Sequence, residues 1–147
     1  MINRGNNSVG GYIAFLLLAT AAVGFWAWQE LAVDSDEPGY LLVNRAYQDQ
    51  VSDVLVEVSG SVIRVLADET ESGLYQKFVI TMPNGLDVQI VHRYKQDNRI
   101  PVRLNDIVTV RGHYQWNEAG GLINWTERDG LFSEYNGWVE LYGKRYE

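Results

Sequence analysis

The stretch IVTVRGHYQWNEAGGLINWT, residues 107–126, decides the fold. Apolar and polar residues alternate along both of its halves, with a Gly-Gly turn between them, which is the pattern of a β-hairpin. A loop NEAG places Ile123 opposite Tyr114. Trp116 and Trp125 then share the face of this pair, and we expect both tryptophans to be core or half-buried packing residues; an exposed stacking platform for a ligand is the alternative.

Alternating segments elsewhere in the chain extend this hairpin into a larger sheet. The other predicted strands are residues 55–67, 74–82, 86–92 and 137–142. Gly60 interrupts the first of them, which predicts a bulge or a sharp bend. A long bent strand, a meander and a final hairpin follow the order of an OB-type barrel. We therefore expect a mainly β fold, a small OB-like barrel of five to six strands in domain 54–147; an unrelated β-sandwich or open meander is the alternative.

The N-terminal residues carry the signal for location. Residues 9–28 contain no charged side chain, and as a helix they would span roughly 30 Å, the thickness of a bilayer's hydrocarbon core. Arg4 precedes them and every acidic residue follows them, so the positive-inside rule places residues 1–8 in the cytoplasm. We expect a single-pass inner-membrane protein whose soluble domain lies in the periplasm or outside the cell. Signal-peptide cleavage followed by secretion is the alternative.

Residues 29–53 are predicted to form a linker and a short helix. The acidic turn DSDEPG at 34–39 precedes apolar positions with loosely helical spacing across residues 40–53. Asp36 is a candidate N-cap. Coil packed on the domain is the alternative.

Composition restricts the function classes. A formal net charge of -7 makes nucleic acid an unlikely partner, because phosphate binding needs positive surface. The absence of cysteine excludes disulfides, thiol catalysis and cysteine-ligated metal. The chain contains no P-loop, dinucleotide fingerprint, G-x-S-x-G or H-E-x-x-H motif. These observations favour a binding module over an enzyme, with no catalytic residue, metal or cofactor assigned.

Two surfaces are candidate binding sites. The segment HRYKQDNRIPVR, residues 92–103, concentrates positive charge for an anionic ligand or an envelope protein partner. The polar face of the hairpin is the second. The candidate binding residues are Arg93, Tyr94, Lys95, Arg99, Arg103, Arg111, His113 and Asn124. Ordinary solvated surface is the alternative for both.

From Gly60 onward the chain resembles the domain-of-unknown-function family 3465, a family of short bacterial envelope proteins. The matching segments are GSVIRVLAD at 60–68, YQKFVI at 75–80, VHR at 91–93, NDIV at 105–108, GHYQWNEAGGLINWTERDG at 112–130 and YNGWVELYGKRY at 135–146. The resemblance implies an exported or anchored single-domain protein with no assigned activity.

The chain departs from that family's pattern chiefly at its histidines. Tyr75, Asn124, Glu127 and Tyr135 stand where the pattern has histidine, His92 remains and His113 is additional. Any metal or proton relay built on those histidines would be largely lost. A degenerate metal-assisted hydrolase or phosphodiesterase, using the acidic group Asp68, Glu69 and Glu71 or the histidines with Glu127 and Asp129, is one alternative function. A structural envelope subunit is the other.

Overall fold

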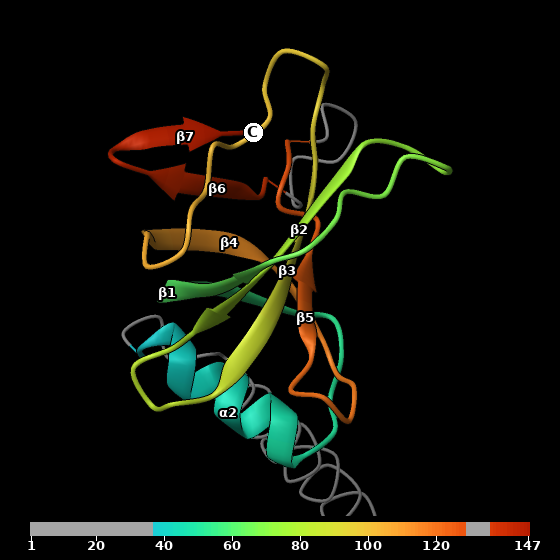
Figure 1. Ribbon diagram of the computed structural model, residues 1–147. Coiled ribbons are helices and arrows are strands. Elements are labelled where there is room, and N and C mark those ends of the chain that lie inside the picture. Colours follow the sequence, from blue (N-terminus) through green and yellow to red (C-terminus); the bar gives the residue numbers. More distant parts are fainter. Residues whose placement is uncertain (1–36, 129–135) are drawn as a thin grey trace, which may run out of the picture. The chain divides into compact units, whose positions relative to one another are not determined.

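A computed structural model describes residues 37–128 and 136–147, which fall in one compact unit, Pro38–Glu147, apart from Glu37 (Figure 1). The predicted tail 1–8 and membrane segment 9–28 lie outside the described residues. Within the described ranges, no helix is long and apolar enough to cross a membrane.

Seven strands form one sheet, and five of them close into a barrel. The strands are β1 (Val54–Val65), β2 (Tyr75–Thr81), β3 (Asp87–Arg93), β4 (Ile107–Gln115), β5 (Leu122–Asn124), β6 (Trp138–Leu141) and β7 (Lys144–Tyr146). Their order is β1-β2-β3-β5-β4-β6-β7, and an additional pairing of β1 with β4 closes the ring. All strand pairs are antiparallel except β3 with β5, which is parallel. The predicted mainly β barrel is confirmed.

The bend of β1 makes this closure geometrically feasible. Its first part, Val54 to Ser61, pairs with β4, and its last part pairs with β2. Ser61 belongs to both pairings, directly after the predicted bend at Gly60, and the β2 pairing shifts register between Val62 and Arg64. A Cβ atom on Gly60 would stand 2.7 Å from the carbonyl oxygen of Thr81. Glycine therefore permits the close approach of β2 where β1 turns from one neighbour to the other.

The hairpin of β4 and β5 has the predicted register. Tyr114 faces Ile123, and both side chains are fully buried. In the loop, the Asn117 side-chain oxygen accepts hydrogen bonds from the N–H groups of Ala119 and Gly121, both at 2.9 Å. These bonds replace the pairing that the strands lose at the turn.

The prediction of a core or half-buried position is wrong for Trp125. The indole is 48 % exposed, whereas Trp116 is half-buried and packs against the core. Trp125 has φ 52, so the chain leaves the alternation of β5 at this residue and Thr126 becomes buried instead. A single left-handed residue inverts the side-chain order that strict alternation would give.

A short helix, α2 (Gly39–Gln48), lies across one end of the barrel (Figure 1). Val43 and Ala46 on its inner face join the core. The helix is shorter than the predicted span 40–53, because the chain turns after Gln48 and Gln50 has positive φ. Pro38 is the N-cap and makes no side-chain cap hydrogen bond; the predicted cap, Asp36, lies outside the described residues.

The C-terminal part of the chain adds a strand that the sequence did not indicate. One last strand over 137–142 was predicted, but the chain reverses at Tyr142 and Gly143, which have φ 51 and 77. β7 then returns along β6 and buries Tyr146 against the core. The β6–β7 hairpin pairs with β4 beside the barrel.

Candidate functional site

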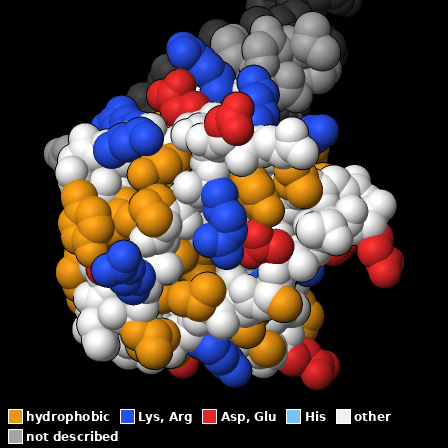
Figure 2. All heavy atoms as spheres, turned by 45° about the horizontal axis from the view of Figure 1, so that its top comes forward, with side chains coloured by type: hydrophobic (Ala, Val, Ile, Leu, Met, Phe, Trp, Pro, Cys, Tyr) orange, Lys and Arg blue, Asp and Glu red, His pale blue; other side chains and the backbone are white. Residues whose placement is uncertain are grey.

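The fold divides the predicted basic segment into separate groups. On the face shown in Figure 2, Lys and Arg side chains lie singly among hydrophobic and acidic ones and do not merge into one basic area. The charges that follow β3 therefore have to be considered one at a time.

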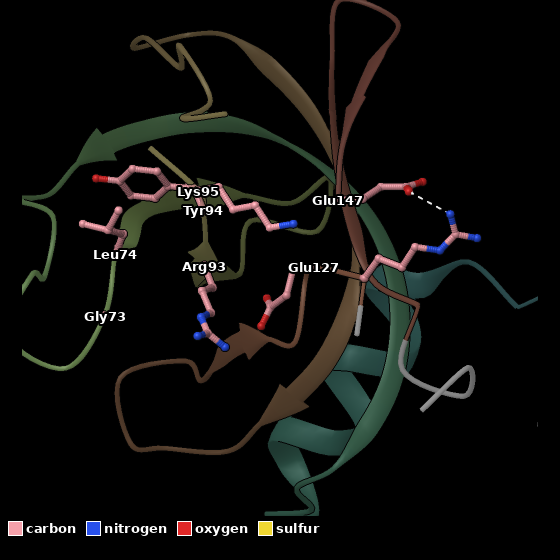
Figure 3. A pocket seen from close by; sticks show the side chains of 8 residues that line it. Gly73, Leu74, Arg93, Tyr94, Lys95, Glu127 and Glu147 are labelled. Carbon is pink, nitrogen blue, oxygen red and sulfur yellow. Dashed lines mark hydrogen bonds and ion pairs between the residues drawn. The ribbon is translucent and has the colours of Figure 1, made fainter. Parts of the chain in front are cut away.

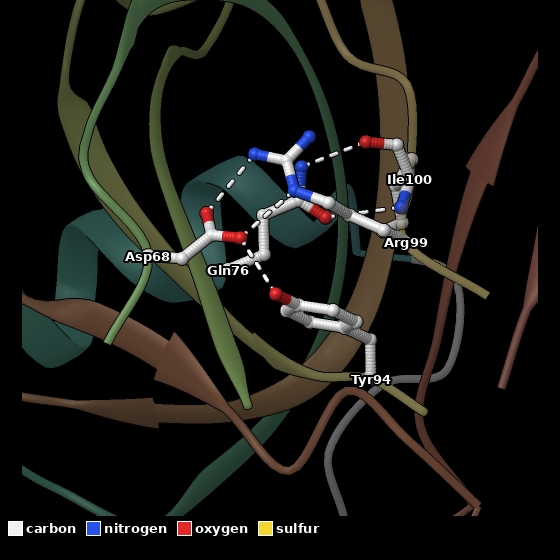
Figure 4. A network of polar contacts seen from close by, with 5 residues as sticks. All are labelled: Asp68, Gln76, Tyr94, Arg99 and Ile100. Carbon is white, nitrogen blue, oxygen red and sulfur yellow. Dashed lines mark hydrogen bonds and ion pairs between the residues drawn. The ribbon is translucent and has the colours of Figure 1, made fainter. Parts of the chain in front are cut away.

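Arg99 is committed to an ion pair within the domain. Its Nε lies 2.8 Å from Oδ2 of Asp68 and its Nη2 lies 3.0 Å from Oδ1. The Tyr94 hydroxyl donates to the same carboxylate at 2.7 Å (Figure 4). The hydrogen bonds from Arg99 hold the pKa of Asp68 below its usual value against the opposing effect of burial. Arg99 and Tyr94, both predicted binding residues, thus join the β1–β2 and β3–β4 connections through Asp68, and Tyr94 also lines the cleft described below.

The buried side chain of Gln76 fixes the next part of the same connection. Its amide nitrogen donates to the carbonyl of Ile100 at 2.7 Å, and its oxygen accepts from the Ile100 N–H at 3.1 Å (Figure 4). Ile100 is itself fully buried. Tyr94 before Arg99 and Ile100 after it are thus both held by hydrogen bonds. These bonds give the start of the β3–β4 connection a defined position.

Arg93 and Lys95 project into a cleft of about 400 Å³. The cleft is lined by Gly73, Leu74, Arg93, Tyr94, Lys95, Glu127, Arg128 and Glu147. Figure 3 shows Arg93 and Glu127 pointing toward one another across it, with Lys95 directed into the same space. Nη1 of Arg128 lies 3.5 Å from Oε2 of Glu147 on the far wall. We call this space the Arg93–Lys95 cleft.

Within the part of the chain that the structure describes, Arg93 and Lys95 make no ion pair with a carboxylate, and both side chains are exposed. Arg103, the fourth predicted cation, is exposed beyond this cleft, and its backbone N–H donates to Asp106 at 2.8 Å. Of the four predicted cations, the structure therefore brings two together in one cleft.

The predicted polar face of the hairpin is divided as well. Arg111 lies in a second cleft of about 340 Å³, where its Nη1 is 3.5 Å from Oε2 of Glu57. His113 is buried, and its Nδ1 lies 2.8 Å from Oδ1 of Asp53. Asn124 pairs with His113 across the strands and is half-buried. His113 and Asn124 line neither cleft.

Sequence reasoning missed the residues that complete the second cleft. The guanidinium of Arg145 stacks on the ring of Trp138, 4.0 Å from its centroid, and its Nε lies 3.1 Å from Oε2 of Glu140. Arg128 and Glu147 line both clefts. The one signal in the sequence is Gly143, because glycine is favoured at the second central position of a tight hairpin turn; the segment after it is too short to show alternation.

Three of the residues proposed for metal chemistry, Asp68, Glu69 and His92, contact other side chains. Asp68 binds Arg99, and Glu69 Oε2 lies 3.1 Å from Nζ of Lys77. His92 is fully buried, with Nδ1 2.9 Å from the hydroxyl oxygen of Thr126, and burial lowers its pKa to about 4. Among the described residues, no group of three or more His, Cys, Asp or Glu side chains is arranged to hold a metal ion; Asp129 lies outside them.

Comparison with protein-family models matches residues 25–147 to the family described as "Protein of unknown function (DUF3465)". The resemblance predicted from residue 60 onward is thereby confirmed, and the match begins upstream of it. No curated protein and no solved structure matches the chain.

Proposed function

Since the chain belongs to this family, whose description assigns no activity, we propose a function from the barrel and its clefts. We propose that the protein is a binding module held to the membrane by residues 9–28, with its barrel outside the cytoplasm. Its ligand is a small anion, which it binds in the Arg93–Lys95 cleft.

The barrel supports an OB-like binding role. Its closure through β1 with β4, and the parallel pairing of β3 with β5, agree with a five-stranded Greek-key barrel of the OB type. In such barrels the ligand face is formed by the second and third strands with neighbouring loops. The cleft occupies a related position, because Gly73 and Leu74 come from the β1–β2 connection and Arg93 ends β3.

The charge state of the cleft carries the proposal. Arg93 and Lys95 make no ion pair within residues 37–128 and 136–147. Arg99, only four positions after Lys95, is by contrast neutralised by Asp68. A bound phosphate or carboxylate would complete two charge-assisted hydrogen bonds there, in a cleft whose three cations, Arg93, Lys95 and Arg128, outnumber its two carboxylates, Glu127 and Glu147. Arg128 supplies a third cation, and its contact with Glu147 is long and exposed, with side chains 65 % and 42 % accessible. Such a surface pair is weak enough to yield to a ligand.

The proposal is tested by titrating the full-length protein in detergent with pyrophosphate and, separately, with citrate, by calorimetry. We expect Arg93→Gln with Lys95→Gln to raise Kd about tenfold, the equivalent of about 1.4 kcal/mol. The affinity of the parent should also fall as salt is added.

The matched control is Arg64→Gln with Arg103→Gln, which removes the same charge from exposed residues that do not line the cleft. Its affinity should equal that of the parent. If both double variants bind the anion equally weakly, the effect comes from net charge and not from the cleft. If the Arg93→Gln, Lys95→Gln variant binds as tightly as the parent, or the parent binds neither anion, the cleft is not an anion site.

A further inference from the structure

A separate surface forms where the bend of β1 meets two turns. The N–H of Val62 donates to the carbonyl of Asp106 at 2.8 Å, and the N–H of Asn105 donates to the carbonyl of Val62 at 2.8 Å. The hydroxyl of Tyr142 donates to the carboxylate of Asp106. These bonds hold the bend, the turn before β4 and the β6–β7 turn side by side.

Four large apolar side chains stand exposed on this surface, which we call the apolar tip. They are Ile63 (43 % exposed), Leu104 (59 %), Ile107 (63 %) and Tyr142 (78 %). None of them belongs to the core cluster or packs against it.

The backbone explains why these side chains point outward. Ile63 lies between the two register positions where β1 shifts against β2, so it is the extra residue of a bulge. Tyr142 has φ 51 at the hairpin turn. Main-chain hydrogen bonds join the bend to the turn before β4, and the apolar atoms of these four side chains remain exposed. Exposed apolar residues that gather in this way mark a surface for interaction.

Cations border the apolar tip in an otherwise acidic protein of formal net charge -7. Arg103 precedes Leu104 and Lys144 follows the β6–β7 turn, and both are exposed. Asp106 is the carboxylate within the tip, and the hydrogen bond from Tyr142, followed by that from the Arg103 N–H, holds its pKa below the usual value. Arg103, Lys144 and Asp106 together therefore give the apolar tip one net positive charge.

We propose that the apolar tip rests on an anionic lipid surface. Aliphatic side chains on turns can enter the acyl boundary, a tyrosine hydroxyl prefers the headgroup level, and bordering Lys and Arg are attracted to anionic headgroups. Self-association through this surface would bring Arg103 and Lys144 of two copies together, which opposes a second copy as the occupant.

The apolar tip is separate from the proposed anion site. The proposal does not depend on anion binding in the Arg93–Lys95 cleft, since neither Leu104 nor Ile107 lines it.

The chain contains no cysteine, so a single introduced cysteine can report the environment of one position in the full-length protein. Ile107→Cys, labelled with an environment-sensitive fluorophore, is reconstituted into phosphatidylcholine vesicles with roughly one third phosphatidylglycerol. Leu55→Cys is the matched control, because Leu55 is 38 % exposed on β1 and pairs with His113, away from the tip. Leu104→Cys replaces the first variant if that variant does not fold.

Lipids that carry a quencher on the acyl chain should quench the probe at Ile107 about twofold more than the probe at Leu55. Adding Arg103→Gln with Lys144→Gln should reduce quenching at Ile107 in anionic vesicles and leave it unchanged in pure phosphatidylcholine. Equal, water-like emission at both positions would overturn the proposal. An Ile107 signal that grows with the protein-to-lipid ratio without lipid quenching would assign the surface to a second copy and overturn it equally.

Discussion

Acidification from pH 7.5 to pH 5 is expected to destabilise the barrel through His92. The ring is fully buried. Its Nδ1 faces the hydroxyl of Thr126, and that hydroxyl donates to the carbonyl of Val91 at 3.1 Å. Because the Thr126 proton is already used, Thr126 must accept a hydrogen bond from His92, which assigns the proton of the neutral ring to Nδ1.

The magnitude follows from the two pKa values. Burial lowers the pKa of His92 from 6.5 to about 4 in the folded state. Below pH 6.5 the imidazole of His92 is therefore protonated in the unfolded chain, whereas in the folded chain it is protonated only below about pH 4. The stability contributed by the neutral ring is complete above pH 6.5 and is lost as the pH falls toward 4. The loss is about 2 kcal/mol at pH 5 and about 3 kcal/mol in full, at about 1.4 kcal/mol for each pH unit between the two values.

Urea unfolding of the fragment 30–147 at pH 7.5, 6.5, 5.5 and 5 measures this loss. Carboxylates with lowered pKa, such as Asp68, titrate in the same way in a variant that lacks the imidazole. The comparison with His92→Gln, which keeps a hydrogen-bonding side chain but does not titrate, therefore isolates the histidine.

The parent should lose about 2 kcal/mol more than His92→Gln between pH 7.5 and 5. If both lose the same free energy, the burial argument fails. Should the variant not fold, the ring resonances of His92 in the parent provide the test, because titration near pH 6.5 in the folded protein contradicts the assigned environment.

Three further substitutions test the packing. Trp125→Ala should change the free energy of unfolding, measured by urea titration, by less than about 1 kcal/mol, because the indole is 48 % exposed. A loss of about 3 kcal/mol or more, typical of a buried tryptophan, would contradict the exposed position. Arg99→Gln should lower the melting temperature by a few degrees and leave anion binding intact, with Asp68→Asn giving a similar loss; weaker anion binding at an unchanged melting temperature would return Arg99 to the site. Gly60→Ala should cost about 1–3 kcal/mol, since its Cβ would stand 2.7 Å from the Thr81 carbonyl; an unchanged denaturation midpoint would show that β2 can move away.

Local sequence patterns predicted the parts of the fold that depend on alternation and on glycine. The register of Tyr114 with Ile123 follows from a loop length that keeps apolar residues on one face, and Gly60 marks the bend of β1. The exposure of Trp125 was not predicted, because one positive φ value reverses the alternation and no glycine marks that position in the sequence. Strand β7 was not predicted, because three residues are too few to show the alternation of a strand.

The candidate site was harder to predict because charge pairing is a tertiary property. Arg93 and Arg99 look equivalent in the sequence, yet Asp68, which lies 31 positions before Arg99, neutralises one of them and not the other. Likewise His113 seemed an exposed polar residue by alternation, but it is buried beside Asp53, 60 positions away. Spacing within a segment cannot reveal partners at such separations.

The seam between β3 and β5 gives the barrel an uneven dynamic profile. Only two residue pairs, Gln89 with Leu122 and Ile90 with Ile123, join these strands, whereas β1 and β4 share eight register positions, Val54 to Ser61. Opening the short seam breaks few main-chain bonds, so amide protons of β5 should exchange with solvent through local opening, while those in the middle of β1 and β4 exchange only on global unfolding. The barrel would then open locally at β5, the strand that leads to Glu127 and Arg128. Entry of a ligand into the Arg93–Lys95 cleft would be coupled to this motion of the barrel.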